Sequence, residues 1–312
     1  MKSFQAETKN AGHSGFSREM LAEKMEFYRQ QLDENGYVVI EGLIDSIKCQ
    51  NSIDAICDFM QVEQFDRHTW YKDAPLNSIG LVPMHQHPAF WAIRQDEVVY
   101  DAFSGLLDEE KLWVTMDRAS FRPPCRYDLE KYGDDANYMH WDYDFRKSAR
   151  NMFQGLIYLA DTDATQGAFS CVPSVYKKIR AGEYEHFDQF DKFTKKGLFL
   201  SHAQEFSDKD IVPIAAPAGS LIIWDSRLPH GCVSNHSPMP RFVQFISMYP
   251  SGDSESSSAK IEDDRESRIQ CFNDKRAPEC HRGLNGQHDP ERHERFELSE
   301  LGRKLVGFDH WE

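Results

Sequence analysis

Short apolar runs separated by Gly, Pro, Asn and Asp occupy the chain from residue 112 to residue 249, and they constrain its fold more than any other feature. These runs are rich in β-branched and aromatic residues and span residues 112–116, 152–159, 168–172, 211–214, 220–224 and 241–249. Strands this brief, with turn residues between them, are typical of barrels and two-sheet jelly rolls. We therefore expect a mainly β fold with flanking helices.

The N-terminal part predicts a helix, a strand and a second helix in that order. Apolar residues recur at helical spacing over residues 17–35, where Ser17 is available as an N-cap and Gly36 would end the helix. A β-branched run over residues 37–40 predicts a strand. Helical spacing then returns over residues 44–62.

The C-terminal part is more polar than the rest of the chain. Residues 251–268 consist largely of Ser, Asp, Glu and Lys, and we expect a solvated loop or linker there. Residues 298–307 predict one more helix. We interpret the chain as a single domain over residues 1–312, with an N-terminal helical lead at 1–36, a β core with helical insertions at 37–250, and a polar linker with a C-terminal extension at 251–312.

The charge balance disfavours nucleic acid as a partner. Asp and Glu number 51 against 36 Lys and Arg, a formal net charge of −15, which repels a phosphate backbone. Hydrophobic residues make up 40% of the chain, enough for a packed core. No run approaches the roughly 18 apolar residues of a membrane span, and the seven scattered cysteines fit reduced thiols. We expect a globular cytoplasmic protein without a membrane segment.

Two residues in one short segment have the spacing of metal ligands. His140 and Asp142 are two positions apart, so in a strand their side chains would project from one face. His230 follows the apolar run at residues 221–224, which would deliver a third ligand from a distant strand. Two histidines and one carboxylate leave three positions of an octahedral ion open, as a non-haem iron(II) centre requires for a keto acid and dioxygen. The alternative ion is zinc, whose sites are more often tetrahedral.

Arg241 stands eleven residues after His230, at the head of an apolar run. A hairpin through the turn between them, which is rich in Ser, Asn and Pro, would return this arginine beside the metal. Its guanidinium fork pairs with a carboxylate through two parallel hydrogen bonds, which suits the distal carboxylate of 2-oxoglutarate. The alternative is a surface ion pair with an acidic side chain. The four residues taken together favour the carboxylate clamp.

In the order and spacing of these four residues, the chain resembles the phytanoyl-CoA dioxygenase-like (PhyH) family of iron(II)- and 2-oxoglutarate-dependent oxygenases over residues 32–250. Further landmarks are Asn-Gly-Tyr-Val-Val-Ile at 35–40, Leu-Ala-Asp at 159–161, Gln-Gly-Ala-Phe-Ser-Cys-Val-Pro at 166–173 and Gly-Ser-Leu-Ile-Ile-Trp-Asp at 219–225. The chain departs from the family at two places. Residues 173–176 read Pro-Ser-Val-Tyr where the family often has Pro-Gly-Ser-His, and Cys232 stands where serine is common.

The resemblance implies a double-stranded β-helix, the cupin-like jelly roll, with iron(II) on His140, Asp142 and His230 and with 2-oxoglutarate on Arg241. It implies that dioxygen and 2-oxoglutarate are consumed, that succinate and carbon dioxide form, and that an unactivated C–H bond of a small metabolite is hydroxylated or desaturated. Related halogenases have a small residue in place of Asp142, so halogenation is disfavoured. The expected partner is a small-molecule substrate of the kind met in secondary metabolism.

Several aromatic and basic residues are candidates for the substrate pocket, although aromatic residues at such spacing also form cores. The candidates are Trp224 and, beside the metal ligands, Tyr138, Tyr143, Phe145 and Arg146. For three other basic residues we favour ordinary ion pairs with acidic side chains over contacts with an anionic substrate. These are Arg118, Arg122 and Arg126.

Two other sets of histidines and cysteines compete as metal sites. His85 and His87 would share one strand face, but Pro88 follows and no carboxylate is paired with them. The second set lacks the close Cys-x2-Cys pairing that identifies structural zinc sites. It comprises Cys271, Cys280, His281, His288 and His293. We disfavour both sets.

Two functional alternatives use the same three ligands. The first is a non-catalytic metal-binding or ligand-sensing barrel, motivated by the altered residues 173–176 and by Cys232. The second is a zinc-dependent hydrolase, which would need a general base near the metal and no arginine clamp. Succinate formation that depends on iron(II) separates the oxygenase from both.

Overall fold

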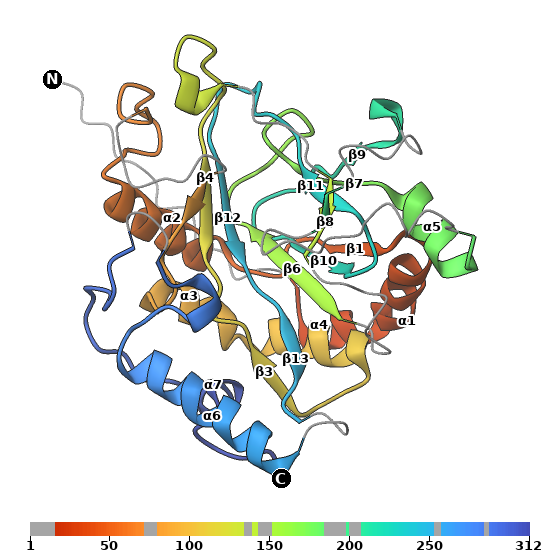
Figure 1. Ribbon diagram of the computed structural model, residues 1–312, viewed down its shortest axis with the longest axis vertical. Coiled ribbons are helices and arrows are strands. Elements are labelled where there is room, and N and C mark those ends of the chain that lie inside the picture. Colours follow the sequence, from red (N-terminus) through yellow and green to blue (C-terminus); the bar gives the residue numbers. More distant parts are fainter. Residues whose placement is uncertain are drawn as a thin grey trace, which may run out of the picture.

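Two antiparallel sheets with helices packed around them make up the architecture of the computed structural model (Figure 1). The structure describes residues 16–71, 80–133, 139–142, 152–183, 198–199, 207–252, 257–283 and 287–312. Within these residues the large sheet has the order β1 (Tyr37–Ile40), β10 (Leu221–Asp225), β6 (Phe153–Tyr158), β12 (Arg241–Phe245), β4 (Ala119–Arg122) and β2 (Leu81–Val82). The small sheet has the order β8 (Leu198–Phe199), β5 (His140–Trp141), β11 (His230–Cys232), β7 (Phe169–Cys171) and β9 (Val212–Pro213). A separate pair is formed by β13 (Met248–Pro250) and β3 (Leu112–Val114).

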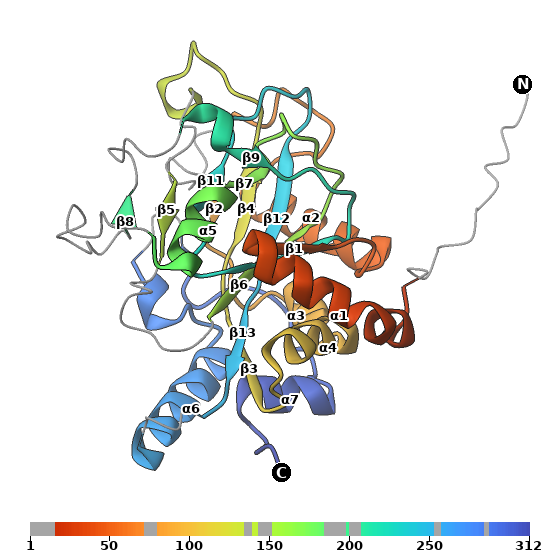
Figure 2. The ribbon, with the colours of Figure 1, turned by 90° about the vertical axis from the view of Figure 1, so that its right-hand side faces the viewer.

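The helices lie mainly at both ends of the chain. They are α1 (Arg18–Asn35), α2 (Ser46–Met60), α3 (Pro88–Arg94), α4 (Glu97–Leu107), α5 (Pro173–Ala181), α6 (Ser258–Asn273) and α7 (Glu300–Val306). Single 3-10 turns occur at η1 (Glu130–Tyr132), η4 (Asp208–Asp210) and η5 (Glu279–His281). Figure 2 shows α1, α3 and α4 on one side of the large sheet and β5 and β7 on the other.

The predicted start of the fold is confirmed in detail. The Ser17 side chain caps α1 by accepting a hydrogen bond from the backbone N–H of Met20. Gly36 ends the helix in a left-handed conformation, with φ of 79°, and donates its N–H to the carbonyl of Leu32. A side chain at this glycine would collide with the Tyr176 ring, because an added Cβ would lie 2.8 Å from its Cγ. The chain therefore turns here directly into β1.

Alternation along the strands divides the large sheet into two faces. Val38 and Ile223 point to the helices and belong to the larger hydrophobic cluster. Their neighbours Val39 and Ile222 belong to a second cluster that also contains Phe169 of the small sheet. This second cluster lies between the two sheets, so the inner faces of both sheets enclose one interior space.

Most of the predicted strands are confirmed, but the last one is divided. The runs at 112–116, 152–159, 168–172, 211–214 and 220–224 correspond to β3, β6, β7, β9 and β10. The run at 241–249 forms β12 and then β13, because its pairing partner changes. Residues up to Phe245 pair with β4 and β6, whereas Ser247 accepts from the N–H of Thr115 and leads into the pair with β3.

The prediction of a solvated linker over 251–268 is wrong, because Ser258–Asn273 forms α6 with Ser257 as its N-cap. The helix carries no broad apolar stripe, and Cys271 is its buried residue. Long polar side chains attach it instead: Arg268 donates to the backbone carbonyls of Val114, Leu305 and Val306. The polar composition therefore concealed a helix that a partly buried guanidinium helps to hold in place.

The other predicted helices are present. Residues 44–62 contain α2, capped by Asp45, and residues 298–307 contain α7, capped by Ser299. Among the described residues no helix has both the length and the apolar character needed to cross a membrane.

Candidate metal centre

Two neighbouring strands of the small sheet bring the predicted histidines together. His140 on β5 stands directly opposite His230 on β11, with ring centroids 4.7 Å apart. Asp142 follows β5 and reaches both rings, at 3.5 Å from the Nε2 atom of His140 and 3.3 Å from that of His230. One ligand atom from each of the three residues lies within 4.8 Å of the others. The structure thus assembles the three residues that the sequence predicted as ligands.

The chemistry of these donors fits a cation. The Nδ1 atom of His230 lies 3.0 Å from the carbonyl oxygen of Leu228, so this nitrogen carries the proton and Nε2 presents a lone pair. The Nε2 lone pair and the Asp142 carboxylate are both acceptors, and they repel each other unless a proton or a metal ion lies between them. Two imidazoles and one carboxylate are the facial set that binds iron(II) with open positions.

The histidines also keep Asp142 ionised. Burial acts to raise the pKa of this carboxyl group, but when protons, and not a cation, lie between the three groups, hydrogen bonds and charges from the protonated His140 and His230 rings outweigh it and lower the pKa well below its usual range. The amide of Gln154 donates to the Oδ2 atom of Asp142 at 2.6 Å and fixes its orientation. Sequence analysis missed Gln154, although a polar residue at the start of an apolar strand was the available signal.

Trp224 supports the same centre from β10. Its Nε1 atom donates to the Gln154 side chain at 3.2 Å, and its ring lies 5.0 Å from the ring of His230. Phe169 packs against both rings, with its centroid 4.5 Å from the indole and 5.9 Å from the His230 ring. Trp224 is only 3% exposed, so it belongs to the wall behind the ligands. The remaining predicted pocket residues, Tyr138, Tyr143, Phe145 and Arg146, lie outside the described residues.

Arg241 reaches the interior from the opposite sheet. The predicted hairpin is wrong: β11 belongs to the small sheet and β12 to the large one, so the loop between them crosses from one sheet to the other. The predicted surface alternative is also wrong, because Arg241 is 4% exposed. Its terminal nitrogens donate to the carbonyl of Gly167 at 2.5 Å and to the Ser120 hydroxyl at 2.8 Å.

The charge of Arg241 is not balanced by an acid. Among the described residues no carboxylate lies within ion-pair distance of it, and its Nε–H is buried without a partner. Burial lowers the pKa of Arg241, and the positive charge of Arg122 lowers it further. A buried guanidinium in this condition is a ready site for an anionic group.

The three arginines for which we expected ordinary ion pairs, Arg118, Arg122 and Arg126, differ in burial and in partner. Arg122 stands opposite Arg241 across the β4–β12 ladder, is 6% exposed and contacts the Cys232 thiol, so it does not lie at the surface as expected. Arg126 makes the expected exposed pair with Asp128. Arg118 also pairs with a neighbouring acid, as expected, and lies nearer the interior.

The competing metal sites are not assembled among the described residues. His85 and His87 follow β2 instead of lying on it. His85 is fully buried against the His281 ring, at 5.2 Å, and His87 serves as the N-cap of α3. The thiol of Cys271 faces a backbone carbonyl, and His288 packs against Phe59. Within the described residues the one group of three or more potential ligands is His140, Asp142 and His230.

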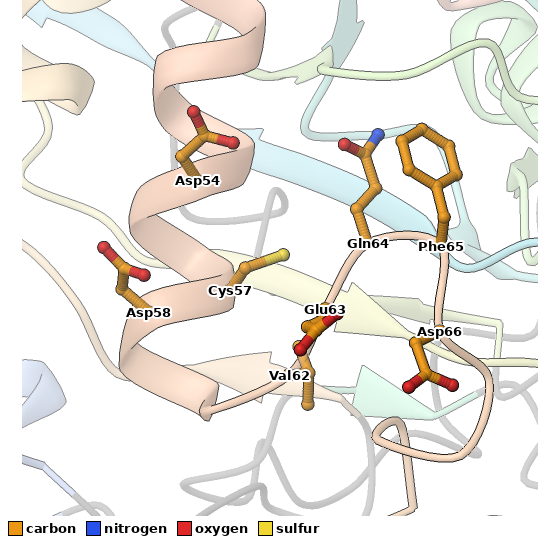
Figure 3. A pocket seen from close by; sticks show the side chains of 8 residues that line it. All are labelled: Asp54, Cys57, Asp58, Val62, Glu63, Gln64, Phe65 and Asp66. Atoms are coloured by element: carbon orange, nitrogen blue, oxygen red, sulfur yellow. The ribbon is translucent and has the colours of Figure 1, made fainter.

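Two surface hollows among the described residues do not include these ligands. The first, of about 510 Å³, lies at the end of α2 and in the loop that follows (Figure 3). Acidic side chains dominate its lining, which comprises Asp54, Cys57, Asp58, Val62, Glu63, Gln64, Phe65 and Asp66. The second, of about 290 Å³, lies beside β3, α6 and the C-terminal residues.

Fold and site together define a two-sheet β protein whose small sheet carries a two-histidine, one-carboxylate centre that is partly open to solvent. The family model of phytanoyl-CoA dioxygenase (PhyH) matches residues 32–243, and the chain belongs to this family. A Dictyostelium discoideum protein, provisionally named a phytanoyl-CoA dioxygenase, is 27% identical over 265 residues, which are 69% of this chain and 72% of the relative. The predicted family is thereby confirmed.

Solved structures share the fold. The structure of GlcNAc Inducible Gene 2 from Candida albicans has a TM-score of 0.62 at 15% identity and covers 91% of this chain and 76% of its own. The epimerase SnoN, solved with Fe3+, alpha ketoglutarate and nogalamycin RO, has a TM-score of 0.51 at 13% identity over 74% of this chain and 85% of its own. At these identities the likeness concerns the fold alone.

Proposed function

We propose that this chain is an iron(II)- and 2-oxoglutarate-dependent dioxygenase with a double-stranded β-helix core, which hydroxylates or desaturates an unactivated C–H bond of a small metabolite. One observation carries the proposal: a two-histidine, one-carboxylate group on the small sheet and a buried arginine on the large sheet, which has no acidic partner among the described residues, face the space between the sheets. Membership of the phytanoyl-CoA dioxygenase family supports it.

His140, Asp142 and His230 would hold the iron. When bound, iron(II) supplies the activation of dioxygen, in which 2-oxoglutarate gives succinate and carbon dioxide while the substrate C–H bond is oxidised. The chain's own contribution is to orient the ligands. Leu228 fixes the His230 tautomer, and Gln154 fixes the carboxylate of Asp142.

Arg241 would bind the distal carboxylate of 2-oxoglutarate. Its guanidinium is held by Gly167 and Ser120, so its direction is set before the co-substrate arrives. A carboxylate would satisfy the unpaired Nε–H and offset the cost of burying the charge. Arg122, directly across the ladder, adds a second positive charge that favours an anion at this end of the interior. The presence of Fe3+ and alpha ketoglutarate in the SnoN structure supports the binding of both groups by a protein of this fold.

The substrate would be a small molecule oxidised within this interior. The nogalamycin compound bound to SnoN supports that class of substrate. No polymer-binding feature accompanies the net charge of −15, which disfavours nucleic acid.

A second candidate function is a metal-binding or ligand-sensing barrel without turnover. The observation in its favour is the contact of Cys232 with Arg122, at a position where the family commonly has serine. Such a protein would bind iron(II) and 2-oxoglutarate but would release no succinate.

The test is succinate formation by protein purified without oxygen and supplied with iron(II), 2-oxoglutarate and a metabolite library. We expect succinate and oxygen uptake that require iron(II) and that Asp142→Ala abolishes. A matched control is Glu26→Ala, which removes a carboxylate that is 91% exposed on α1. Metal binding without succinate would support the second candidate, and hydrolysis with zinc in place of oxidation would refute the oxygenase.

A further inference from the structure

The geometry points to Arg118 as the residue that binds a carboxylate group of the organic substrate beside the candidate metal centre. Asp117 orients the Arg118 guanidinium, and His281 from the C-terminal region lies beside Asp117. We call Arg118, Asp117, His85 and His281 the Arg118 subsite. The inference rests on the proposed function in one respect, namely that the bound acid is the molecule that becomes oxidised.

Strand register aims Arg118 into the interior. The N–H of Phe245 donates to the carbonyl of Arg118 at 3.0 Å, which extends the β4–β12 ladder by one residue. Directly opposed residues in an antiparallel pair share a face, and Phe245 packs in the cluster between the sheets. Leu156 is opposite Phe245 on the next strand, and Gln154, which holds Asp142, is two residues before it. Arg118 therefore points to the space in which the metal ligands lie.

Its guanidinium has free donors. The Nε atom lies 3.2 Å from the Oδ1 atom of Asp117, which also accepts from the Arg118 backbone N–H. The two terminal nitrogens have no hydrogen-bond partner among the described residues, although the side chain is only 20% exposed. One edge of the fork is thus fixed, and the donors at the other end are available for a carboxylate.

Two neighbouring histidines also lack partners. The rings of His85 and His281 stack with centroids 5.2 Å apart and an interplanar angle of 26°. The Nε2 atom of His85, which is fully buried, and the Nδ1 atom of His281 have no hydrogen-bond partner in the part of the chain that the structure describes. Buried polar atoms are normally satisfied by protein, water or a ligand. These two independent orphans indicate that a polar ligand belongs here.

His281 is the member of the Arg118 subsite that links it to the metal centre, because the charge of Asp142 acts on its ring. Its Nε2 atom is 3.8 Å from Asp117. Burial lowers the pKa of His281, and the charges of Arg118 and Asp142 both act on the same ring, with opposite signs. The ring is accordingly neutral and close to both groups. His281 lies beyond residues 32–243, which match the family model.

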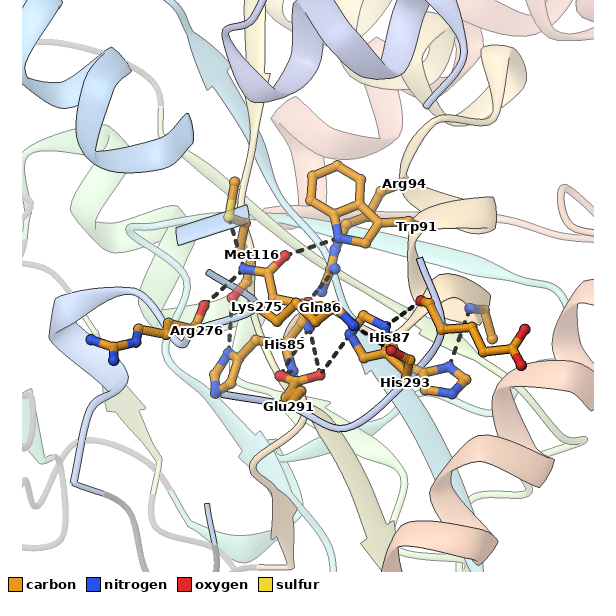
Figure 4. Close-up of polar contacts among 12 residues, drawn as sticks. His85, Gln86, His87, Trp91, Arg94, Met116, Lys275, Arg276, Glu291 and His293 are labelled. Carbon is orange, nitrogen blue, oxygen red and sulfur yellow. Dashed lines mark hydrogen bonds and ion pairs between the residues drawn. The ribbon is translucent and has the colours of Figure 1, made fainter. Parts of the chain in front are cut away.

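The subsite is built on a rigid frame. Figure 4 shows the Glu291 carboxylate accepting from the backbone N–H groups of His85 and Gln86, the latter at 2.9 Å. Arg94 donates to the carbonyls of His85 and Asp117, at 2.5 and 2.7 Å. Both ends of the subsite are therefore fixed by buried charged side chains before any ligand binds.

The charges favour a carboxylate over a phosphate. Asp117 already balances part of the positive charge of Arg118, and Asp142 adds a second negative charge nearby. A phosphate dianion would be repelled by both acids, whereas a planar monoanion with two oxygens matches the free guanidinium edge. Arg241 and Arg122 lie further along the interior in the place assigned to 2-oxoglutarate. The two acids would thus bind at separate arginines.

The test compares acids with their amides in a binding experiment that needs no turnover. Calorimetric titration would use acetate, benzoate, phenylacetate and indole-3-acetate, each beside its amide, with 2-oxoglutarate present in excess to occupy Arg241. We expect at least one acid to bind about 10-fold or more tightly than its amide. Arg118→Met should abolish this preference and Arg118→Lys should retain part of it, because lysine keeps the charge but loses the fork.

The matched control is Arg126→Met, which removes an arginine that is exposed and paired with Asp128. It should leave the preference unchanged. If Arg118→Met does not fold, Arg118→Gln replaces it. A preference that survives the loss of Arg118, or its absence from all four wild-type pairs, would overturn the inference. Loss of iron-dependent succinate formation with the Arg118-dependent preference intact would instead count against the proposed function alone.

Discussion

Replacing Glu291 by glutamine should remove a pH dependence of stability that the wild-type protein shows between pH 4.5 and 8. Glu291 is a carboxyl group 7% exposed in the frame behind the Arg118 subsite. Burial raises its pKa from 4.5 to about 7, and the N–H groups of His85 and Gln86 offset only part of that effect.

The direction follows from proton linkage. The folded protein holds the proton of Glu291 more tightly than the unfolded chain does, so the neutral form stabilises the fold. This contribution is fully present below pH 4.5 and is lost as the pH rises through about 7. A pKa difference of roughly 2.5 units corresponds to about 3 kcal/mol of unfolding free energy. Because Glu291 is only 7% exposed, solvent screening reduces this free energy little.

Urea unfolding of wild type and Glu291→Gln at several pH values measures the effect. The amide remains neutral, accepts from the same backbone N–H groups, and faces the unpartnered Nε2 atom of His293, which lies 3.9 Å from the present carboxylate. The unfolding free energy of wild type relative to the variant should fall by about 3 kcal/mol between pH 4.5 and 8. Glu300→Gln, at an 86% exposed side chain, is the control and should show no such change. A difference that stays constant with pH would refute the reasoning.

Three further predictions concern backbone, metal and co-substrate. Gly219→Ala should destabilise by about 3 kcal/mol or more and Gly42→Ala by about 1, as measured by urea unfolding. Both glycines have positive φ, but an added Cβ meets a backbone carbonyl at 2.2 Å only at Gly219, so equal effects would contradict the steric account. Gln154→Ala should weaken iron(II) binding about 10- to 100-fold in an anaerobic titration, since the Asp142 carboxylate loses its orienting donor. Arg241→Met should weaken 2-oxoglutarate binding about 100-fold while iron(II) affinity is unchanged, and an unaltered dissociation constant would remove Arg241 from the site.

Local sequence signals predicted the parts of the fold that depend on near neighbours. The helix α1 begins after Ser17 and ends before Gly36 as predicted, because capping and a left-handed turn act within one helical turn of the chain. The helix α6 was not predicted, since it has no broad apolar stripe: its apolar contacts lie near its C-terminal end, at Ile269, Cys271 and Phe272, and Arg268 adds polar ones. The hairpin before β12 was wrong for a related reason: a polar turn fits either a hairpin or a crossing between sheets, and only the pairing of distant strands decides which forms.

The candidate site likewise contains residues that the local sequence could predict and residues that it could not. His140 and Asp142 could be predicted because two-residue spacing in a strand is a local property. Gln154, whose partner is Asp142, could not, because β6 meets the metal ligands only after both sheets have formed. The Arg118 subsite was still harder to predict. It joins β4 to residue His281 of the C-terminal region, more than half the chain away, and the sequence around either residue gives no sign of the other.

Anaerobic addition of iron(II) and then 2-oxoglutarate to the metal-free protein tests the three ligands together, because a keto acid that chelates iron(II) gives a visible absorption band. We expect one iron(II) per chain and a band in the wild type, with neither in Asp142→Ala. Wild-type protein that develops no band, or an Asp142→Ala protein that develops the same one, would contradict the assignment of His140, Asp142 and His230 as the iron site.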